Sequence, residues 1–547
     1  KELRKLEIKI IKQLQVLKDS VSGLEPFQKE LIPTSQQNLA ASFQVELFSR
    51  IQLTQFYGIE IDDFAHEVAT LALWLAEHQM NVEFFKEFGS TNPTLPLTEA
   101  GHIVHGNACR LDWEKVCPKN KHDEVYVLGN PPYLGSRNQN KEQKEDLKSV
   151  FLKDYKSLDY ISAWFLLGSK YLRNTKSKIA FVSTNSLTQG EQVGILWPRI
   201  LEDNLEIQFA HDSFKWENSA KNKAGVTVVI IGIANRLNSF KTFYVDGLVK
   251  KVDFISPYLT FTKPIYIYRR SMILSSQLPK IVYGSLLNDK GNLVFTPEEK
   301  ETFISNNPSA SKYFKKFIGA DEFINGNEKW VLYIRDDEIN EAKKIVGIDI
   351  RLNKVTEHRV KSTEKSTRKL AQYPNRYYFS SYNETQSIII PRTSSENREY
   401  IPIGYLNSDY IVSDAAQVVY NAKPYIFGIL TSKMHNLWIK AVCGSLETRI
   451  RYSSALGYNT FPFPQTSDQR NEEISRCVFR ILEEREKHPD KTLAQLYNPD
   501  KMPVGLREAH RLNDLAIERC YRSRAFESDE ERLQYLFKLY EQMIAEE

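Results

Sequence analysis

The stretch EVYVLGNPPY, residues 124–133, guides the interpretation of the first half of the chain. Its first six residues are mostly apolar and valine-rich, which predicts a strand. The loop that follows consists of Asn130, Pro131, Pro132 and Tyr133. Because two successive prolines fix two φ angles and remove two backbone donors, this loop is predicted to be stiff. The carbonyl oxygens of Asn130 and Pro131 are then left to accept hydrogen bonds from a ligand.

Such a loop suits an exocyclic amine. The lone pair of that amine is delocalised into its ring, and two acceptors, the side-chain oxygen of Asn130 and the carbonyl of Pro131, would hold its hydrogens and favour a nucleophilic, tetrahedral nitrogen. Tyr133 offers a flat face for a base turned out of a duplex. The alternative is an ordinary strand-to-loop turn in which the asparagine and the aromatic ring are incidental.

Strand and helix patterns alternate from about residue 40 to residue 235. This alternation predicts a mostly parallel sheet covered by helices, with ligands bound at the carboxyl ends of the strands. The predicted strands lie at residues 56–61, 124–129, 178–183 and 225–231, and the clearest helical patterns lie at residues 63–77 and 160–172.

The ends of two further strands carry candidate residues for a nucleotide-like ligand. Glu60 could accept hydrogen bonds from both hydroxyls of a ribose, and Ile61 would pack on an adenine face. Asn107 follows a short apolar pair and could bind an adenine amine. The alternative for the first segment is a helix start, in which Asp62 and Asp63 favour the helix dipole. For Asn107 the alternative is an ordinary loop residue.

The order strand-Glu60, strand-Asn107, then Asn130 to Tyr133 resembles the amino-methyltransferases of DNA, in the group whose target-recognition domain follows the catalytic one. That resemblance implies a Rossmann-like sheet, S-adenosylmethionine as cofactor, base flipping and no metal. Several later segments are similar to the MmeI-like methyltransferases, which are Type IIL restriction-modification proteins. These segments are residues 210–220, 390–398, 451–453, 458–462, 496–503 and 506–510.

By the same likeness, Phe214 or Trp216 would be the second aromatic residue that sandwiches a flipped adenine, although either could belong to the core. The family also places a glycine-rich Asp-Pro-x-x-Gly-x-Gly loop before the strand that bears the acid, and nothing like it occurs between Lys1 and Glu60. We therefore expect the first strand, its loop and everything before it, including any nuclease domain, to lie outside this sequence. This fragment alone should bind the cofactor poorly.

The chain should contain about three domains, because its 547 residues exceed one ordinary core. We predict an incomplete methyltransferase catalytic domain at residues 1–250, a strand-rich α+β target-recognition domain at residues 251–464 and a helical region at residues 465–547. The amino-terminal segment is predicted to be an amphipathic helix, not a signal peptide. Its apolar residues recur at helical spacing, at Leu3, Leu6, Ile10, Leu14 and Leu17.

Composition limits the class of protein. A hydrophobic content of 41% with 26% charged residues is typical of a globular chain, and no apolar run approaches the roughly 18 residues of a membrane-spanning helix. The five cysteines are scattered and unpaired in sequence, which favours a cytoplasmic protein, and we expect a monomer. A net charge of +4 is small for this length, so DNA contacts require local clusters of basic residues.

One such cluster contains Lys361, Lys365, Arg368 and Lys369, and it suits contacts with phosphates; the alternative is a solvated helix face. Arg392 and Arg398 lie among small polar residues in a predicted loop and are better suited to reading base edges.

The expected function is methylation of the N6 amine of a flipped adenine in double-stranded DNA, within a restriction-modification protein. Methylation of cytosine at its exocyclic nitrogen and a non-catalytic recognition subunit remain alternatives. Protein-glutamine methylation fits poorly, because those enzymes are compact. A carbon-methylating cytosine enzyme needs a nucleophilic cysteine, normally after a proline, and Cys117-Pro118 has the reverse order.

Overall fold

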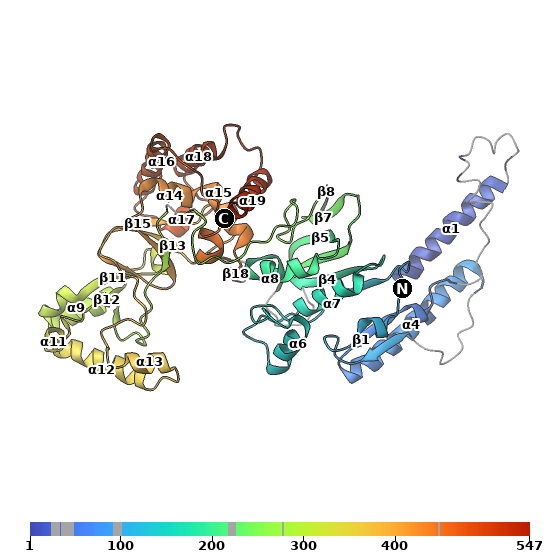
Figure 1. Ribbon diagram of the computed structural model, residues 1–547, viewed down its shortest axis with the longest axis horizontal. Coiled ribbons are helices and arrows are strands. Elements are labelled where there is room, and N and C mark those ends of the chain that lie inside the picture. The colour runs from blue at the N-terminus through green and yellow to red at the C-terminus, as the bar shows by residue number, and fades with distance from the viewer. Residues whose placement is uncertain are drawn as a thin grey trace. The chain divides into compact units, whose positions relative to one another are not determined.

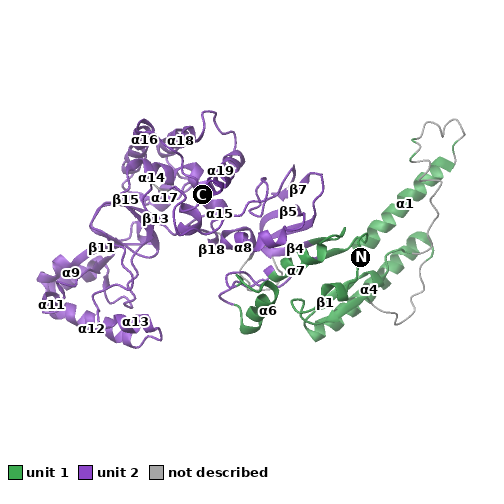
Figure 2. Cartoon of the chain, viewed as in Figure 1, with its two compact units in different colours: residues 1–127, 139–155, 163–179 green, residues 128–138, 156–162, 180–547 purple. Residues whose placement is uncertain are grey.

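The computed structural model describes residues 1–22, 24, 33, 35, 49–90, 101–216, 226–275, 278–446 and 449–547 (Figure 1). The chain divides into two compact units (Figure 2). Unit 1 contains residues 1–127, 139–155 and 163–179, and unit 2 contains residues 128–138, 156–162 and 180–547.

Unit 1 is built around a two-stranded parallel sheet. Strand β1 (Tyr57–Glu60) pairs with β2 (His102–His105) over its whole length, so that Glu60 lies opposite His105. Helix α4 (Asp63–Phe88) follows β1 and runs well beyond the predicted end at residue 77. It ends where Gly89 adopts φ +72°, a conformation that glycine reaches without steric cost.

Helix α1 (Glu2–Ser22) confirms the predicted amino-terminal helix, but the buried row differs from the predicted stripe. Ile8 and Ile11 pack in a core cluster with Met80 and Phe84 of α4. Apolar residues occupy more than one face of α1, and spacing alone could not identify the face that contacts α4. The exposed apolar side chains of α1 include Leu3, Leu6 and Ile10.

A six-stranded sheet has the order β3-β4-β6-β5-β7-β8. It is mixed, whereas the alternation predicted mostly parallel strands, because β5 is antiparallel to β6 and parallel to β7. A two-residue Asp246-Gly247 turn, with positive φ at both residues, joins β7 to β8 as a hairpin. The strands are β3 (Tyr126–Gly129), β4 (Lys178–Thr184), β5 (Leu205–Trp216), β6 (Val226–Asn235), β7 (Lys241–Val245) and β8 (Leu248–Val252). Helices before and between them are α5 (Trp113–Val116), α6 (Lys141–Phe151), α7 (Ser162–Leu172) and α8 (Gly190–Ile200).

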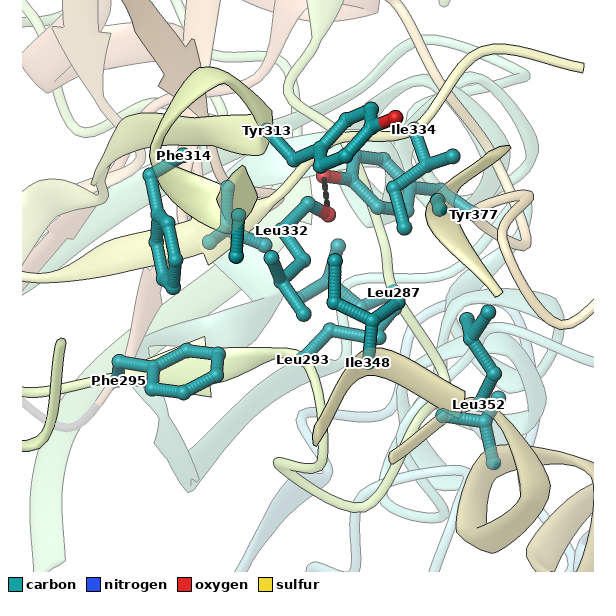
Figure 3. Packing of buried hydrophobic residues seen from close by; sticks show 14 of the residues in the cluster. Leu287, Leu293, Phe295, Tyr313, Phe314, Leu332, Ile334, Ile348, Leu352 and Tyr377 are labelled. Atoms are coloured by element: carbon teal, nitrogen blue, oxygen red, sulfur yellow. Dashed lines mark hydrogen bonds between the residues drawn. The ribbon is translucent and has the colours of Figure 1, made fainter. Parts of the chain in front are cut away.

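The middle of unit 2 is strand-rich, as predicted, and contains two four-stranded sheets of order β10-β12-β11-β16 and β15-β13-β17-β9. Figure 3 shows the core of the first sheet, where the buried Tyr377 hydroxyl donates to the Leu332 carbonyl at 2.9 Å. The strands are β9 (Ile281–Tyr283), β10 (Val294–Phe295), β11 (Phe314–Ile318), β12 (Trp330–Leu332), β13 (Ser387–Pro391), β14 (Thr393–Ser394), β15 (Gly404–Leu406), β16 (Tyr410–Val412), β17 (Ala416–Tyr420), β18 (Ser445–Leu446) and β19 (Arg449–Arg451). The helices are α9 (Pro297–Asn306), α10 (Ala320–Asn325), α11 (Ile339–Ala342), α12 (Val346–Val360) and α13 (Lys365–Leu370).

The end of the chain is helical, as predicted (Figure 1). In helix α16, Ile474, Val478 and Ile481 are the buried residues and form its apolar face. No helix among the described residues is long and apolar enough to cross a membrane. The helices are α14 (Pro424–Thr431), α15 (Lys433–Val442), α16 (Asp468–Glu486), α17 (Leu493–Leu496), α18 (Val504–Tyr521) and α19 (Asp529–Ala545).

Helix α18 is bonded to residues that precede it by about a hundred positions. The Asp514 carboxylate is buried and accepts a hydrogen bond of 2.6 Å from the Tyr400 hydroxyl. Its other oxygen accepts one of 2.7 Å from the backbone N–H of Lys433, the first residue of α15. One carboxylate therefore joins three segments of unit 2.

Candidate functional site

The Asn130–Tyr133 loop begins directly after β3, as the sequence predicts. Strand β3 stands first in the sheet order, with β4 beside it. The Asn130 side chain is exposed and Pro131 is buried, while Tyr133 is half-buried. The asparagine is thus presented to solvent on a loop whose next residue is anchored in the protein.

A buried carboxylate fixes the end of this loop. Asp159 Oδ1 accepts a hydrogen bond of 2.8 Å from the backbone N–H of Leu134, the residue after Tyr133. The Leu134 carbonyl in turn accepts one of 3.1 Å from the N–H of Tyr160. The loop and the segment before α7 are therefore joined by a reciprocal pair of bonds one residue beyond the aromatic side chain.

The other oxygen of Asp159 faces the end of β4. Oδ2 accepts long hydrogen bonds of 3.5 Å from the hydroxyls of Thr184 and Ser186. Burial raises the pKa of Asp159 above its ordinary value, and the hydrogen bonds from Leu134, Ile161 and the two hydroxyls oppose that rise. Our reading of the sequence missed this residue. The signal was an acid inside the otherwise apolar run that leads into a buried helix.

The aromatic candidates lie at the end of β5. The register between β5 and β6 shifts between His211 and Phe214, and a bulge of this kind changes the direction in which the following side chains point. The Phe214 ring is half-buried and meets the His211 ring edge-on, with centroids 4.8 Å apart. The Trp216 side chain and residues 217–225, which include part of the family-like segment 210–220, lie outside the described part of the chain.

In unit 1, Glu60 lies at the carboxyl end of β1. Its Oε1 accepts hydrogen bonds from the backbone N–H groups of Ile61 at 2.9 Å and Asp62 at 3.1 Å. Asp62 caps α4 by accepting from the Ala65 N–H at 2.8 Å, so the helix-start interpretation is right for Asp62. Glu60 is a second acid at this turn, and Ile61 beside it is 64% exposed.

Asn107 lies at the adjacent strand end, because β1 and β2 are parallel neighbours. Its amide donates to the buried Asp146 at 3.0 Å, and its oxygen accepts from the Cys109 N–H at 2.8 Å. Arg110 donates to the same carboxylate at 2.7 Å. The structure therefore brings Glu60 and Asn107 to one edge of the sheet and fixes the orientation of the asparagine through an acid that the sequence analysis did not predict.

These residues fit the nucleoside end of S-adenosylmethionine. A carboxylate held at a strand end can accept bonds from ribose hydroxyls, an exposed isoleucine can pack on a purine, and an oriented amide can meet its polar edge.

The predicted phosphate-binding residues occupy α13 and the turn before it. Lys361, Lys365, Arg368 and Lys369 are all exposed. Arg368 folds back to donate to the carbonyls of Ser362 at 2.8 Å and Thr363 at 2.7 Å.

Two other arginines of the same basic stretch have a structural role. Arg359 is fully buried and donates to the carbonyls of Leu287, Asn288, Tyr373 and Arg376 at 2.9 to 3.1 Å. Arg351 donates to the Asn292 carbonyl and lies over the Phe295 ring at 3.7 Å. The carbonyls that these two arginines bind come from loops that are distant in sequence.

The predicted base-reading arginines are both half-buried. Arg392 donates to the Asp414 carbonyl at 2.7 Å and lies over the Tyr283 ring at 4.9 Å. Arg398 donates to the Ser394 hydroxyl at 3.4 Å, and burial lowers the pKa of its guanidinium. These bonds leave further N–H groups on each side chain, since a guanidinium has five.

The fold is that of a Rossmann-like methyltransferase sheet, followed by a strand-rich α+β target-recognition domain and a helical region. Three family models match in succession: the MmeI DNA-methyltransferase domain at residues 1–245, the MmeI target recognition domain at residues 262–465 and the MmeI C-terminal domain at residues 466–546. The chain belongs to the MmeI family.

Individual relatives agree with this assignment. The chain is 46% identical to DNA methyltransferase A of Bacillus subtilis (strain 168) over 549 residues, which is 99% of this chain and 59% of the length of that protein. Its structure is similar to that of the Type IIL restriction-modification enzyme MmeI in complex with DNA, with a TM-score of 0.83 and 38% identity. That match covers 100% of this chain and 71% of the solved one.

Proposed function

We propose that the protein transfers a methyl group from S-adenosylmethionine to the N6 amine of an adenine flipped out of double-stranded DNA. The observation that carries the proposal is the Asn130–Tyr133 loop, which follows the first strand of the sheet with its asparagine exposed and its end fixed by Asp159. The match to a methyltransferase domain followed by a target recognition domain supports it.

In this proposal each residue has a separate task. S-adenosylmethionine supplies the activated methyl group when bound, and Glu60, Ile61 and Asn107 hold its nucleoside end. The Asn130 side-chain oxygen and the Pro131 carbonyl accept the hydrogens of the target amine. Pro132 stiffens the loop, and Tyr133 stacks on the flipped base with Phe214 or Trp216 on its other side.

We further propose the division into a catalytic domain at residues 1–250, a target-recognition domain at 251–464 and a helical domain at 465–547. Lys361, Lys365, Arg368 and Lys369 contact phosphates, and Arg392 and Arg398 read base edges. The solved relative, a restriction-modification enzyme in complex with DNA, supports double-stranded DNA as the partner. We also propose that the protein is a cytoplasmic monomer. We propose that it carries a nuclease domain elsewhere in its chain.

Cytosine methylation at the exocyclic nitrogen is the second candidate, since the same loop could hold either amine. Mass spectrometry of nucleosides from methylated DNA separates N6-methyladenine from N4-methylcytosine. Detection of N4-methylcytosine alone would exclude the adenine assignment.

The Asn130→Ala variant of the full-length protein tests the site. Loss of an acceptor that acts on the reacting amine should lower kcat by about 100-fold or more, while the Kd for DNA stays unchanged because no phosphate contact is removed. Asn138→Ala, at an exposed asparagine further along the same loop, is the matched control and should keep full activity. Turnover of Asn130→Ala within about tenfold of the wild type would reject the catalytic assignment.

A further inference from the structure

Two exposed apolar residues face each other in the target-recognition segment. Leu286 and Phe379 form an antiparallel bridge in which each N–H donates to the other's carbonyl, at 2.9 Å and 3.1 Å. Directly opposed residues in such a bridge project their side chains to the same side. Leu286 is 38% exposed and Phe379 is 47% exposed, so together they form an apolar surface, here called the Leu286–Phe379 pair.

Hydrogen bonds connect this pair to the basic helix α13. The hydroxyl of Tyr378, the residue before Phe379, donates to Glu364 Oε1 at 2.8 Å. The same carboxylate accepts from the hydroxyls of Ser366 and Thr367, in the first turn of α13. On the other strand, Asn288 donates to the Thr367 hydroxyl at 2.9 Å. Both chain segments of the pair are thus fixed next to the helix that carries Lys365 and Lys369.

Further hydrogen bonds connect the segment before Leu286 to Arg392. The Ser285 carbonyl, next to Leu286, accepts from the Asp414 N–H at 3.1 Å. The Asp414 carbonyl accepts from Arg392 at 2.7 Å, and the Arg392 guanidinium lies over the Tyr283 ring. The lysines of α13 and Arg392, which we propose to contact phosphates and bases, therefore flank one apolar pair.

This arrangement indicates the chemistry of the partner. Exposed lysines on one side favour an anionic ligand, yet two adjacent apolar side chains favour a surface that excludes water. Double-stranded DNA can offer both, because charged phosphates border base steps whose apolar faces become accessible when the step is partly unstacked. A single anion or an acidic protein surface would leave the apolar pair in water.

We propose that the Leu286–Phe379 pair is an apolar wedge that packs against a base step of the bound DNA, between the phosphate contacts of α13 and the base contact of Arg392. Apolar side chains at such positions partly unstack the bases that they touch. This inference rests on the proposed function, in which α13 and Arg392 contact DNA.

The test uses Phe379→Ala and Leu286→Ala in the full-length protein. Phe379→Ala should raise the Kd for a DNA duplex that carries the methylated sequence by about tenfold, the value of one base-aromatic contact. Leu286→Ala removes the aliphatic half of the pair and should raise the same Kd by a smaller factor. The slope of log Kd against log salt should stay as in the wild type, whereas Lys365→Ala should reduce it by about one unit. Phe479→Ala is the matched control, since Phe479 on α16 is 51% exposed, and it should leave Kd unchanged.

A second measurement detects the unstacking itself. Duplexes with 2-aminopurine at successive positions around the methylated base should show one position, distinct from that base, whose fluorescence rises on binding. Phe379→Ala should abolish that rise and Phe379→Trp should restore it. If folded Phe379→Ala showed the same Kd for DNA and the same fluorescence rise as the wild type, the wedge would be overturned. It would also be overturned if the substitution abolished self-association of the protein and left DNA binding unchanged. A wild-type protein that neither binds nor methylates DNA would instead refute the proposed function.

Discussion

Asp159 illustrates how much one buried side chain can determine about a loop. Its two oxygens accept hydrogen bonds from the segment after Tyr133 and from the end of β4, so it couples the loop to the sheet. We regard Asp159 as a positioning residue for the proposed reaction. An acid is suited to this position because all the groups that face it in these bonds are donors.

Removal of both acceptor oxygens tests that role. Asp159→Ala leaves the Leu134 N–H without its acceptor, so it should lower kcat about tenfold or more and leave the KM for S-adenosylmethionine and the Kd for DNA nearly unchanged. Asp123→Ala, at an exposed acid before β3, is the control. If the variant kept the kcat of the wild type and showed only a raised KM, a positioning role for Asp159 would be contradicted.

The sequence indicated candidate site residues at the ends of strands, and it did not indicate the residues that hold them in place. Asn130 and Glu60 became candidates because their types and their places after strands carry chemical meaning. Asp146 and Asp159 were missed, since their partners are backbone N–H groups, hydroxyls and an amide brought near only by folding. Arg359 is a further example, since it lies in a basic stretch of sequence and is nevertheless buried.

At the scale of elements, the connection between α18 and the segments before it depends on a titrating group. Burial raises the pKa of Asp514 from its ordinary value of 3.8 to about 7, opposed by the hydrogen bonds from Tyr400 and Lys433. Between these two pH values the folded protein binds a proton that the unfolded chain has released. The stability contributed by this group is therefore present at low pH and is lost as pH rises toward 7.

Asp514→Asn should remove that dependence, because its oxygen still accepts from Lys433 and its amide can donate to the Tyr400 hydroxyl. The Tm of the variant minus the Tm of the wild type should be larger at pH 8 than at pH 5. Thermal unfolding at several pH values measures this difference, with Asp500→Asn at an exposed acid as control. A difference in Tm that does not change with pH would show that Asp514 keeps its ordinary pKa.

Element boundaries show where sequence patterns were sufficient. Strand β4 follows the predicted strand at residues 178–183 to within one residue, since alternate residues of this segment are apolar and buried. The sheet order and the antiparallel β5–β6 pair were not predicted, because pairing depends on contacts between distant segments.

At the scale of the whole molecule, we predict that residues 262–465 determine which DNA sequence is modified. Exchange of this segment for that of a relative should transfer the recognised sequence while leaving the methylated atom the same. Sequencing of the methylated products measures both properties. A hybrid that folds and methylates the original sequence would place recognition elsewhere in the chain.

Such an exchange of specificity is favoured by the way Arg359 is bonded. It holds the segments around Leu287 and Arg376 through four main-chain carbonyls, and a carbonyl is present whatever the side chain at that position. Neighbouring exposed positions can therefore accept new residues while the backbone that presents them keeps its shape. An anchor of this kind makes the surface evolvable, because selection can alter its specificity without first having to repair the scaffold beneath it.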